Sequence, residues 1–399
     1  MFFNAVWIYG ALALLIFGMA TRQAALTALA TLLLLTAGVS WLWNHFALHA
    51  VGYRRRLSAG RIFRGETITV EFELINRKLL PLAWIEAEDQ VPERIEALDR
   101  RLAPSTNPTS RALPYLTSLR PYERVAWTAT LRCPHRGAFT LGPSQLRSGD
   151  IFGFFSRTRT IADRDPILVY PRVPPLPELG LAPRAIFGDR RARRIALPDP
   201  LRTVGVRDYR PEDSFRHVHW KATARAGQPQ VRVFEPTTSL QVGVFLNLDA
   251  EGQSWRAVDS EPLERAIEVA AAIAAGAAGE RRPFGVYSNR LVGGSGQALR
   301  VPPGSGPAQL SRCLEGLAKL SAFATVDFPR HLRAETLSFP WGVTIVVVTA
   351  TMAPALAATL EALRATGHQL VLVATEPIVP PAIRGLTVSN AERGVRSAE

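Results

Sequence analysis

The first part of the chain consists of two apolar runs separated by a short polar break. Phe2–Ala20 contains no charged residue, and Ala24–Trp43 is a second uncharged run. A helix rises 1.5 Å per residue, so each run reaches about 30 Å, the thickness of a bilayer's hydrocarbon core. Because only three residues join the runs, the pattern predicts an antiparallel transmembrane hairpin over residues 1–46.

The distribution of arginine predicts the orientation of this hairpin in the membrane. Arg22 alone lies in the turn, whereas four arginines follow the second run: Arg54, Arg55, Arg56 and Arg61. The positive-inside rule therefore places both termini and the bulk of the chain in the cytoplasm. Three aromatic residues suit the interface on that side: Trp41, Trp43 and Tyr53. A cleaved signal peptide is disfavoured, because no basic segment precedes the first run and a second run follows it.

Residues 54–173 show the alternation typical of strands. Ile68, Val70 and Phe72 alternate with polar residues, and a second period of two covers residues 125–132. Turn-forming glycine, proline and asparagine separate several such runs. The pattern predicts a small antiparallel β-sandwich-like domain.

The C-terminal part alternates short apolar runs with helical patterns over residues 240–390. The runs at 241–248, 343–349 and 369–374 are of strand length. Strand–helix alternation predicts an α/β domain with a parallel sheet covered on both faces. A proline- and arginine-rich connector, residues 174–239, precedes this domain, and a frayed tail, residues 391–399, follows it. The predicted class is therefore a multidomain α+β protein.

Composition narrows the possible classes. Hydrophobic residues make up 47% of the 399 residues, which excludes a disordered chain. Cys133 and Cys313 lie too far apart to indicate a metal or disulfide framework, so we expect two free thiols. The net charge is +13, and residues 189–232 hold 11 basic and 5 acidic side chains. Nucleic-acid binding through this connector stays an alternative, although no element that reads nucleic acid accompanies the charge.

Three segments carry a resemblance to a known family. They are RGAFTLGP at residues 136–143, SGDIFGFF at residues 148–155 and RDYRPEDSFRHVHWKATAR at residues 207–225. With the apolar N-terminus, they make the chain resemble the bacterial "domain of unknown function 58" family along essentially its whole length. The resemblance implies an inner (cytoplasmic) membrane anchor, a β-domain and a von Willebrand factor A-like, Rossmann-type C-terminal domain. It also implies association with MoxR-type AAA+ ATPases and other membrane proteins, and no established activity.

A von Willebrand A domain can hold a metal through an Asp-x-Ser-x-Ser motif, and this chain has a degenerate version. Asp249 occupies the first position, but Glu251 and Gln253 replace the two serines. Asp249 and Glu251 are therefore only candidate ligands. We expect neither a metal nor another cofactor, because two hard hydroxyl ligands are missing.

The charged motif supplies the remaining candidate site. Its members are Arg207, Asp208, Tyr209, Arg210, Pro211, Asp213, Arg216, His219, Trp220 and Arg225. A metal-dependent hydrolase using Asp213 and His219 is the catalytic alternative, in which His217 and His219 share a face of an extended segment. In a helix, however, these histidines point about 200° apart, and Asp213 becomes a cap for the turn at Ser214.

No nucleophile–base pair accompanies the motif, so we expect no catalytic residue and no enzyme. Arginine–carboxylate pairs would instead pin the segment, with Tyr209, Phe215 and Trp220 as an apolar anchor and Arg225 beside an acidic partner. The motif is then either a scaffold or a scaffold that also presents a docking surface. The sequence as a whole favours a membrane-anchored cytoplasmic adaptor that works with a MoxR-type ATPase in assembling or remodelling other proteins.

Overall fold

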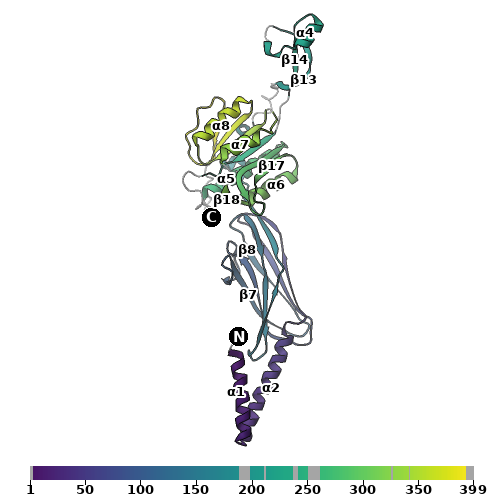
Figure 1. Cartoon of the computed structure of the whole chain (residues 1–399), viewed down its shortest axis with the longest axis vertical. Coiled ribbons are helices and arrows are strands. Elements are labelled where there is room, and N and C mark those ends of the chain that lie inside the picture. Colours follow the sequence, from purple (N-terminus) through teal and green to yellow (C-terminus); the bar gives the residue numbers. More distant parts are fainter. Residues whose placement is uncertain are drawn as a thin grey trace. The chain divides into compact units, whose positions relative to one another are not determined.

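The chain is a mixed α+β protein with an N-terminal apolar helix, as the sequence predicts (Figure 1). The computed structural model describes residues 3–187, 198–210, 213–236, 241–249, 261–324, 327–340 and 342–391. They divide into two compact units, Met1–Val169 and Tyr170–Glu399. Each unit is described by itself.

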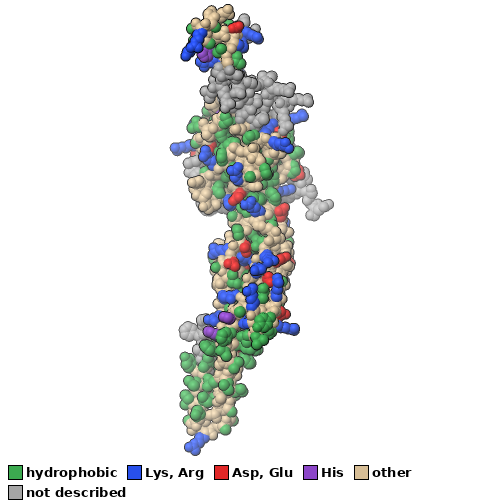
Figure 2. All heavy atoms as spheres, turned by 90° about the vertical axis from the view of Figure 1, so that its right-hand side faces the viewer, with side chains coloured by type: hydrophobic (Ala, Val, Ile, Leu, Met, Phe, Trp, Pro, Cys, Tyr) green, Lys and Arg blue, Asp and Glu red, His purple; other side chains and the backbone are tan. Residues whose placement is uncertain are grey.

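Two helices, α1 (Phe3–Ala20) and α2 (Ala24–Ala47), open the first unit. They approach closely at Gly18, where an added Cβ would lie 2.9 Å from the backbone nitrogen of Thr27. Within the described residues, α2 alone is long and apolar enough to cross a bilayer, and the apolar stretch of α1 covers Ile8–Ala20. Figure 2 shows hydrophobic side chains along the surface of these helices. The second predicted span stays a prediction.

Three sheets follow the helices. The first has the order β1-β3-β8-β5, the second β11-β10-β4-β7-β6 and the third β2-β12-β9. Pairings in the two larger sheets are antiparallel. The strands are β1 Val51–Leu57, β2 Arg61–Phe63, β3 Thr67–Asn76, β4 Leu82–Pro92, β5 Glu96–Ala97, β6 Ala103–Pro104, β7 Ser110–Leu119, β8 Arg124–Arg132, β9 Gly137–Leu141, β10 Ser144–Gly149, β11 Ser156–Ile161 and β12 Asp165–Tyr170.

The core of this β-domain follows from the alternation in the sequence. Ile68, Val70 and Phe72 on β3 are buried, whereas Thr69 and Glu71 between them are exposed. Apolar side chains of both larger sheets pack into one core, which includes Val51 of β1. Burying one face of each strand fixes the strand register, because a one-residue slip would turn the apolar set to solvent.

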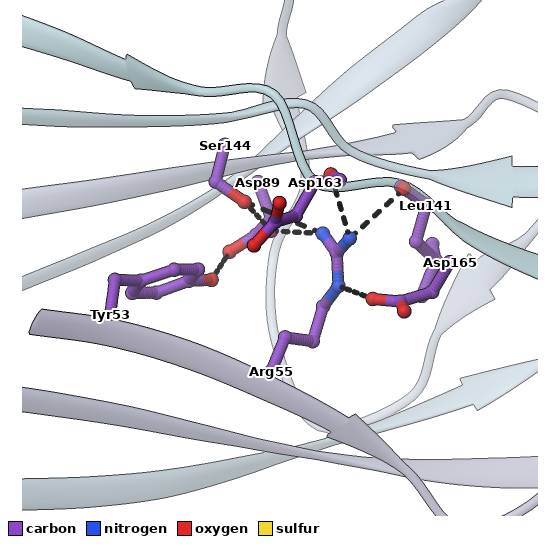
Figure 3. A network of polar contacts seen from close by, with 7 residues as sticks. All are labelled: Tyr53, Arg55, Asp89, Leu141, Ser144, Asp163 and Asp165. Carbon is purple, nitrogen blue, oxygen red and sulfur yellow. Dashed lines mark hydrogen bonds and ion pairs between the residues drawn. The ribbon is translucent and has the colours of Figure 1, made fainter.

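A buried ion-pair network joins five strands of the β-domain (Figure 3). The Arg55 guanidinium of β1 donates to Asp89 Oδ1 and to Asp165 Oδ2, both at 2.6 Å, and its side chain is only 3% exposed. It also donates to the backbone oxygens of Leu141 and Asp163. Ser144 Oγ donates to Asp89 at 2.5 Å. From β1, one guanidinium thus contacts β4, β9, β10 and β12, and its contact with β10 is a hydrogen bond to Ser144 Oγ at 3.4 Å.

Two residues of this network correct the interpretation of the membrane flank. Arg55 is buried in the β-domain, so it does not contribute a free positive charge beside the membrane. Burial acts to lower the pKa of Arg55, but the Asp89 carboxylate, followed by Asp165, outweighs it and leaves the pKa above its ordinary value. The Tyr53 hydroxyl donates to Asp89, so Tyr53 lies in the domain and not at a membrane interface. Burial, followed by Asp89, raises the pKa of Tyr53.

The second unit contains a sheet of order β17-β16-β15-β19-β20-β21, with β18 paired to β16. Strands β16, β15, β19, β20 and β21 are parallel, and β17 and β18 are antiparallel to β16. Their bounds are β15 Val242–Leu246, β16 Phe284–Val292, β17 Ala298–Gly304, β18 Leu320–Ala324, β19 Thr344–Thr349, β20 Gln369–Ala374 and β21 Thr387–Asn390. Every residue of β15 and β19 is buried, which is typical of a sheet covered on both faces.

Helices cover this sheet. Phe328 of α7 (Phe328–Thr336) and Leu360 of α8 (Pro354–Ala365) share an apolar cluster with Phe245 of β15. Helix α5 (Glu261–Gly279) contacts α6 (Pro307–Ala318) and strands β15 and β16. Helix α7 and strand β21 were not expected, and each is short.

The predicted connector is more regular than its proline content indicates. Helices η1 (Leu176–Leu179) and α3 (Pro183–Phe187) precede β13 (Pro198–Asp208) and β14 (Gln230–Pro236). Leu176 and Phe187 pack against Gly276 of α5, where an added Cβ would lie 2.7 Å from the Leu176 side chain. Residues 176–179 and 183–187 of the proline- and arginine-rich connector are therefore helical. Arg190–Arg194 and the tail from residue 392 lie outside the described residues.

We predict that both thiols react slowly in the folded protein. Cys133 and Cys313 are buried and free, and burial raises the pKa of Cys133 to about 11 and that of Cys313 to about 12. At pH 8 the thiolate fraction is then roughly 100-fold below that of an exposed cysteine for Cys133 and roughly 1,000-fold below it for Cys313. Thiol titration with a chromogenic disulfide should be slow in native protein and fast in denaturant. Rapid modification of either cysteine in the native state would contradict the fold.

We also predict that Asp89→Ala destabilises the β-domain by about 3–5 kcal/mol, because the buried Arg55 charge loses its main partner. The matched control is Glu93→Ala. Glu93 forms an ion pair with Arg111 at 3.9 Å in which both side chains are more than half exposed, so its loss should cost at most about 1 kcal/mol. Denaturant unfolding of the detergent-solubilised chain gives both free energies. Equal effects of the two variants would contradict a stabilising role for the network.

Candidate functional site

The charged motif folds as a strand hairpin with two short helices between its strands. Strands β13 and β14 are antiparallel, with Asp208 opposite Gln230 and Arg207 opposite Val231. Between them lie η3 (Phe215–His217) and α4 (Trp220–Ala226). Gly227 ends α4 in the left-handed conformation, φ 69°, which glycine adopts without steric cost. Pro211 and Glu212 lie outside the described residues.

Asp213 closes the loop that follows β13. Its carboxylate accepts hydrogen bonds from Arg207 Nη1 and Nη2, both at 2.7 Å, and from the backbone nitrogen of Arg210 at 2.8 Å. The hydrogen bonds from Arg207, followed by that from the Arg210 backbone, lower the pKa of Asp213. The predicted arginine–carboxylate pair is present. Asp213 does not cap η3, however, because its oxygens are directed back to Arg207 and Arg210.

His219 has a local structural role that the sequence did not reveal. It is the N-cap of α4, and its Nδ1 accepts a hydrogen bond from the backbone nitrogen of Ala222 at 3.1 Å. Its backbone nitrogen also donates to the Gln230 oxygen on β14. One ring nitrogen is therefore already engaged. In the part of the chain that the structure describes, no group of three or more His, Cys, Asp or Glu residues is arranged to hold a metal ion.

The aromatic residues of the motif are exposed, which corrects the expected apolar anchor. Phe215 is 73% exposed and Trp220 is 70% exposed. Tyr209 lies beside Phe215, with ring centroids 5.3 Å apart. The hairpin is too small to enclose them, because the buried apolar side chains among its described residues are Val218 and Val231. Removing Trp220 should therefore cost far less stability than removal of a core aromatic residue.

Basic residues flank Phe215 and Trp220 in the sequence. Arg210, Arg216 and Arg225 are exposed. No described residue forms an ion pair with Arg225, which corrects the expectation of an acidic neighbour. Asp208 is instead held by Gln230, whose Nε2 donates to it at 2.5 Å. We call the exposed residues Phe215, Arg216, Trp220 and Arg225 the hairpin surface. An exposed surface of aromatic and basic side chains can bind a partner.

Asp249 lies at the carboxyl end of β15, where open α/β sheets bind ligands. Asn289 Nδ2 donates to both of its carboxylate oxygens, at 3.1 and 3.2 Å. Thr351 Oγ1 donates to the backbone oxygen of Asp249. Nearby, Asn247 Nδ2 donates to Thr349 Oγ1 at 3.0 Å. Glu251 lies outside the described residues.

Arg290 was missed as a member of this sheet edge. Its side chain comes from β16, is buried and donates to the backbone oxygen of Leu248. Burial lowers the pKa of Arg290, and the Asp249 charge partly offsets that effect. A positive guanidinium thus already acts on the only described carboxylate of the degenerate metal motif. It makes the edge unfavourable for a second cation.

Comparison with known proteins bears on the segment that contains these two regions. The family model described as "Protein of unknown function DUF58" matches residues 205–378. A curated protein, "Uncharacterized protein YeaD" of Bacillus subtilis (strain 168), is 25% identical over 231 residues, 57% of this chain and 53% of that protein. The chain thus spans about half the length of this relative.

Solved structures resemble only a part of the chain. A non-cellulosomal cohesin from Archaeoglobus fulgidus is 10% identical with a TM-score of 0.19, and covers 29% of this chain and 90% of its own. Spo0M from Bacillus subtilis is 13% identical with a TM-score of 0.18, and covers 30% and 49%. Neither score carries an argument about fold or function. The resemblance to the family of unknown function 58 is confirmed over residues 205–378, which include the whole charged motif and most of the α/β sheet.

Proposed function

We propose that this protein is a membrane-anchored interaction protein whose hairpin surface docks a partner protein. The observation that carries the proposal is the exposure of Phe215 and Trp220 on a loop that is held by the bidentate Arg207–Asp213 pair. Large exposed apolar side chains gain free energy when a partner covers them. Tryptophan and arginine are also enriched among the residues that dominate interface energies. A braced loop loses little conformational entropy on binding.

The anchor in this proposal is the α1–α2 hairpin, with both termini in the cytoplasm of a bacterium. Helix α2 has the length and apolarity of a span, and α1 runs beside it. Arg54, Arg56 and Arg61 stay exposed after α2 and support the orientation, although Arg55 no longer does. The docking surface would then be tethered at the inner face of the cytoplasmic membrane.

The partner we propose is a MoxR-type AAA+ ATPase, with other membrane proteins as clients for assembly or remodelling. The family resemblance supports this choice by association, not by chemistry. The mixed sheet of the second unit, with parallel strands flanked by helices, is compatible with a von Willebrand factor A-like domain. We do not favour the hydrolase that uses Asp213 and His219, because Arg207 and the Ala222 backbone engage these groups. Nor does a described contact favour nucleic-acid binding.

We predict that the protein has no tight Mg²⁺ site. Asp249 is held by Asn289 and faces the charge of Arg290, so a divalent cation would meet electrostatic repulsion. Calorimetric titration of the full-length chain should detect no micromolar site, and Asp249→Ala should leave the heats unchanged. A micromolar site that Asp249→Ala abolishes would refute this prediction.

We predict that Trp220→Ala weakens binding to a purified MoxR-type ATPase from the same organism by tenfold or more, since hot-spot truncations cost about 2 kcal/mol or more. Because Trp220 is exposed, thermal melting of the Trp220→Ala variant should match that of the wild type. The matched control is Leu116→Ala, which removes another exposed apolar side chain, on β7, and should leave binding intact.

Asp213→Ala tests the brace separately. It frees the loop from Arg207, so binding should weaken while Trp220 is retained. If the wild type binds the ATPase and the Trp220, Asp213 and Leu116 variants all bind equally, the hairpin is not the docking site. A wild type that does not bind would exclude this partner.

A further inference from the structure

Basic side chains of the β-domain hold the C-terminal end of α2. Lys78 Nζ donates to the backbone oxygens of Ala47 at 2.6 Å and His49 at 2.8 Å. Arg157 Nη1 donates to the His45 oxygen at 3.1 Å, and Arg159 donates to Leu48 and Val51. These bonds satisfy carbonyls that a helix end leaves unpaired and complement its dipole. Positive charge is therefore concentrated where the apolar helix ends.

A polar cavity of about 640 Å³ opens at this junction. Trp41, Asn44 and His45 line it from α2, and Arg147, Ser156 and Arg157 line it from β10 and β11. No carboxylate is among its lining residues. Arg147 lies opposite Glu86 in the register of β10 and β4, yet no described residue forms an ion pair with Arg147. The cavity thus offers one unpaired guanidinium and a second beside it.

The length of α2 indicates the level of this cavity in the membrane. From Ala24 to Trp41, α2 rises about 27 Å, close to the ~30 Å thickness of the hydrocarbon core. Trp41, at the cavity wall, is therefore at the level where the acyl region meets the headgroups. Figure 2 shows the same change on the surface, from hydrophobic side chains over the helices to histidine and basic side chains at their end.

The β10–β11 turn lies on the membrane side of this cavity. Arg159 reaches the Leu48 oxygen and Arg157 reaches the His45 oxygen, so β11 runs along α2 toward its apolar part as it approaches the turn. The turn presents Ile151 and Phe152, each 58% exposed. Its shape is fixed by Asp150, whose carboxylate accepts hydrogen bonds from the backbone nitrogens of Phe152, Phe154 and Phe155. Exposed apolar side chains at this depth are suited to lipid rather than water.

We propose that the cavity between α2 and the β10–β11 hairpin binds the phosphate of an anionic phospholipid headgroup. Guanidinium forks match the geometry of phosphate oxygens, and the Ser156 hydroxyl and Asn44 amide add hydrogen-bond donors. Trp41 packs against the glycerol region of the lipid, where indole rings are favoured. The inference rests on the membrane anchoring in the proposed function.

Basic groups at the helix end also act on one another. Burial and the nearby Arg159 charge lower the pKa of Lys78 to about 8. A bound phosphate would compensate part of this positive charge. Free phosphate offers the same chemistry but no acyl chains, so it would not use the apolar turn or Trp41. We therefore assign the site to a lipid.

The test titrates the full-length chain, in a zwitterionic detergent, with three probes: dihexanoyl phosphatidylglycerol, dihexanoyl phosphatidylcholine and inorganic phosphate. The wild type should bind phosphatidylglycerol about tenfold more tightly than phosphatidylcholine. Arg147→Ala should lose most of that preference, since a basic residue near an anionic lipid contributes about 1 kcal/mol, and Arg147→Lys should retain part of it. Arg147 is exposed and has no described partner, so neither change should disturb folding.

Arg132→Ala is the matched control. Arg132, on β8, is exposed and lies opposite Thr67 at one end of β3. The other end of β3, where Asn76 pairs with Val51, is the end near α2. Removing Arg132 should therefore have no effect on lipid binding. Inorganic phosphate that competes as well as phosphatidylglycerol would overturn the lipid assignment. Equal binding by the wild type and Arg147→Ala would overturn the site itself. Flotation with vesicles tests the anchor independently: a wild type that does not float refutes the anchoring, not the anion chemistry.

Discussion

The buried Arg55 guanidinium constrains how the strands of the β-domain come together. It is on the first strand after α2 and donates to Asp89, Asp165 and two backbone oxygens. A charge that is 3% exposed is tolerable only when carboxylates surround it, so strands β1, β4 and β12 must come together in one register. Because β1 follows the apolar helix directly, the same contact fixes where the chain leaves α2. The helix end then lies against β11, where Arg157 and Arg159 complete its backbone hydrogen bonding.

A second constraint is the small size of the β13–β14 hairpin. A motif of this length cannot enclose its aromatic residues, so it is stabilised by the Arg207–Asp213 pair and the His219 cap instead of a core. Phe215 and Trp220 stay exposed as a consequence. The arginine–carboxylate pairing that the sequence indicated therefore braces an exposed surface and not a buried scaffold. That result moves the balance between scaffold and docking surface toward docking.

Charge has opposite consequences at two places in this protein. At the end of β15 the buried Arg290 acts on Asp249 and opposes a cation. At the end of α2 several basic groups gather without a lining carboxylate and favour an anion. Both regions are rich in polar groups, and only the sign of the local charge separates them. An electrostatic argument about either region must therefore include residues that come from distant strands.

Local patterns in the sequence determined the apolar N-terminal helix, the alternating burial of β3 and the buried strands of the α/β sheet, because periodicity reports which face of an element is covered. The sequence also indicated the arginine–carboxylate pairing of the charged motif, since both partners lie within six residues. Tertiary structure alone decided the rest. Arg55 and Asp89 are 34 residues apart, Arg290 lies on β16 whereas Asp249 follows β15, and Arg147 and Trp41 line one cavity only after β10 has folded beside α2. The exposure of Trp220 was decided in the same way, because burial depends on the size of the surrounding unit and not on the residue type.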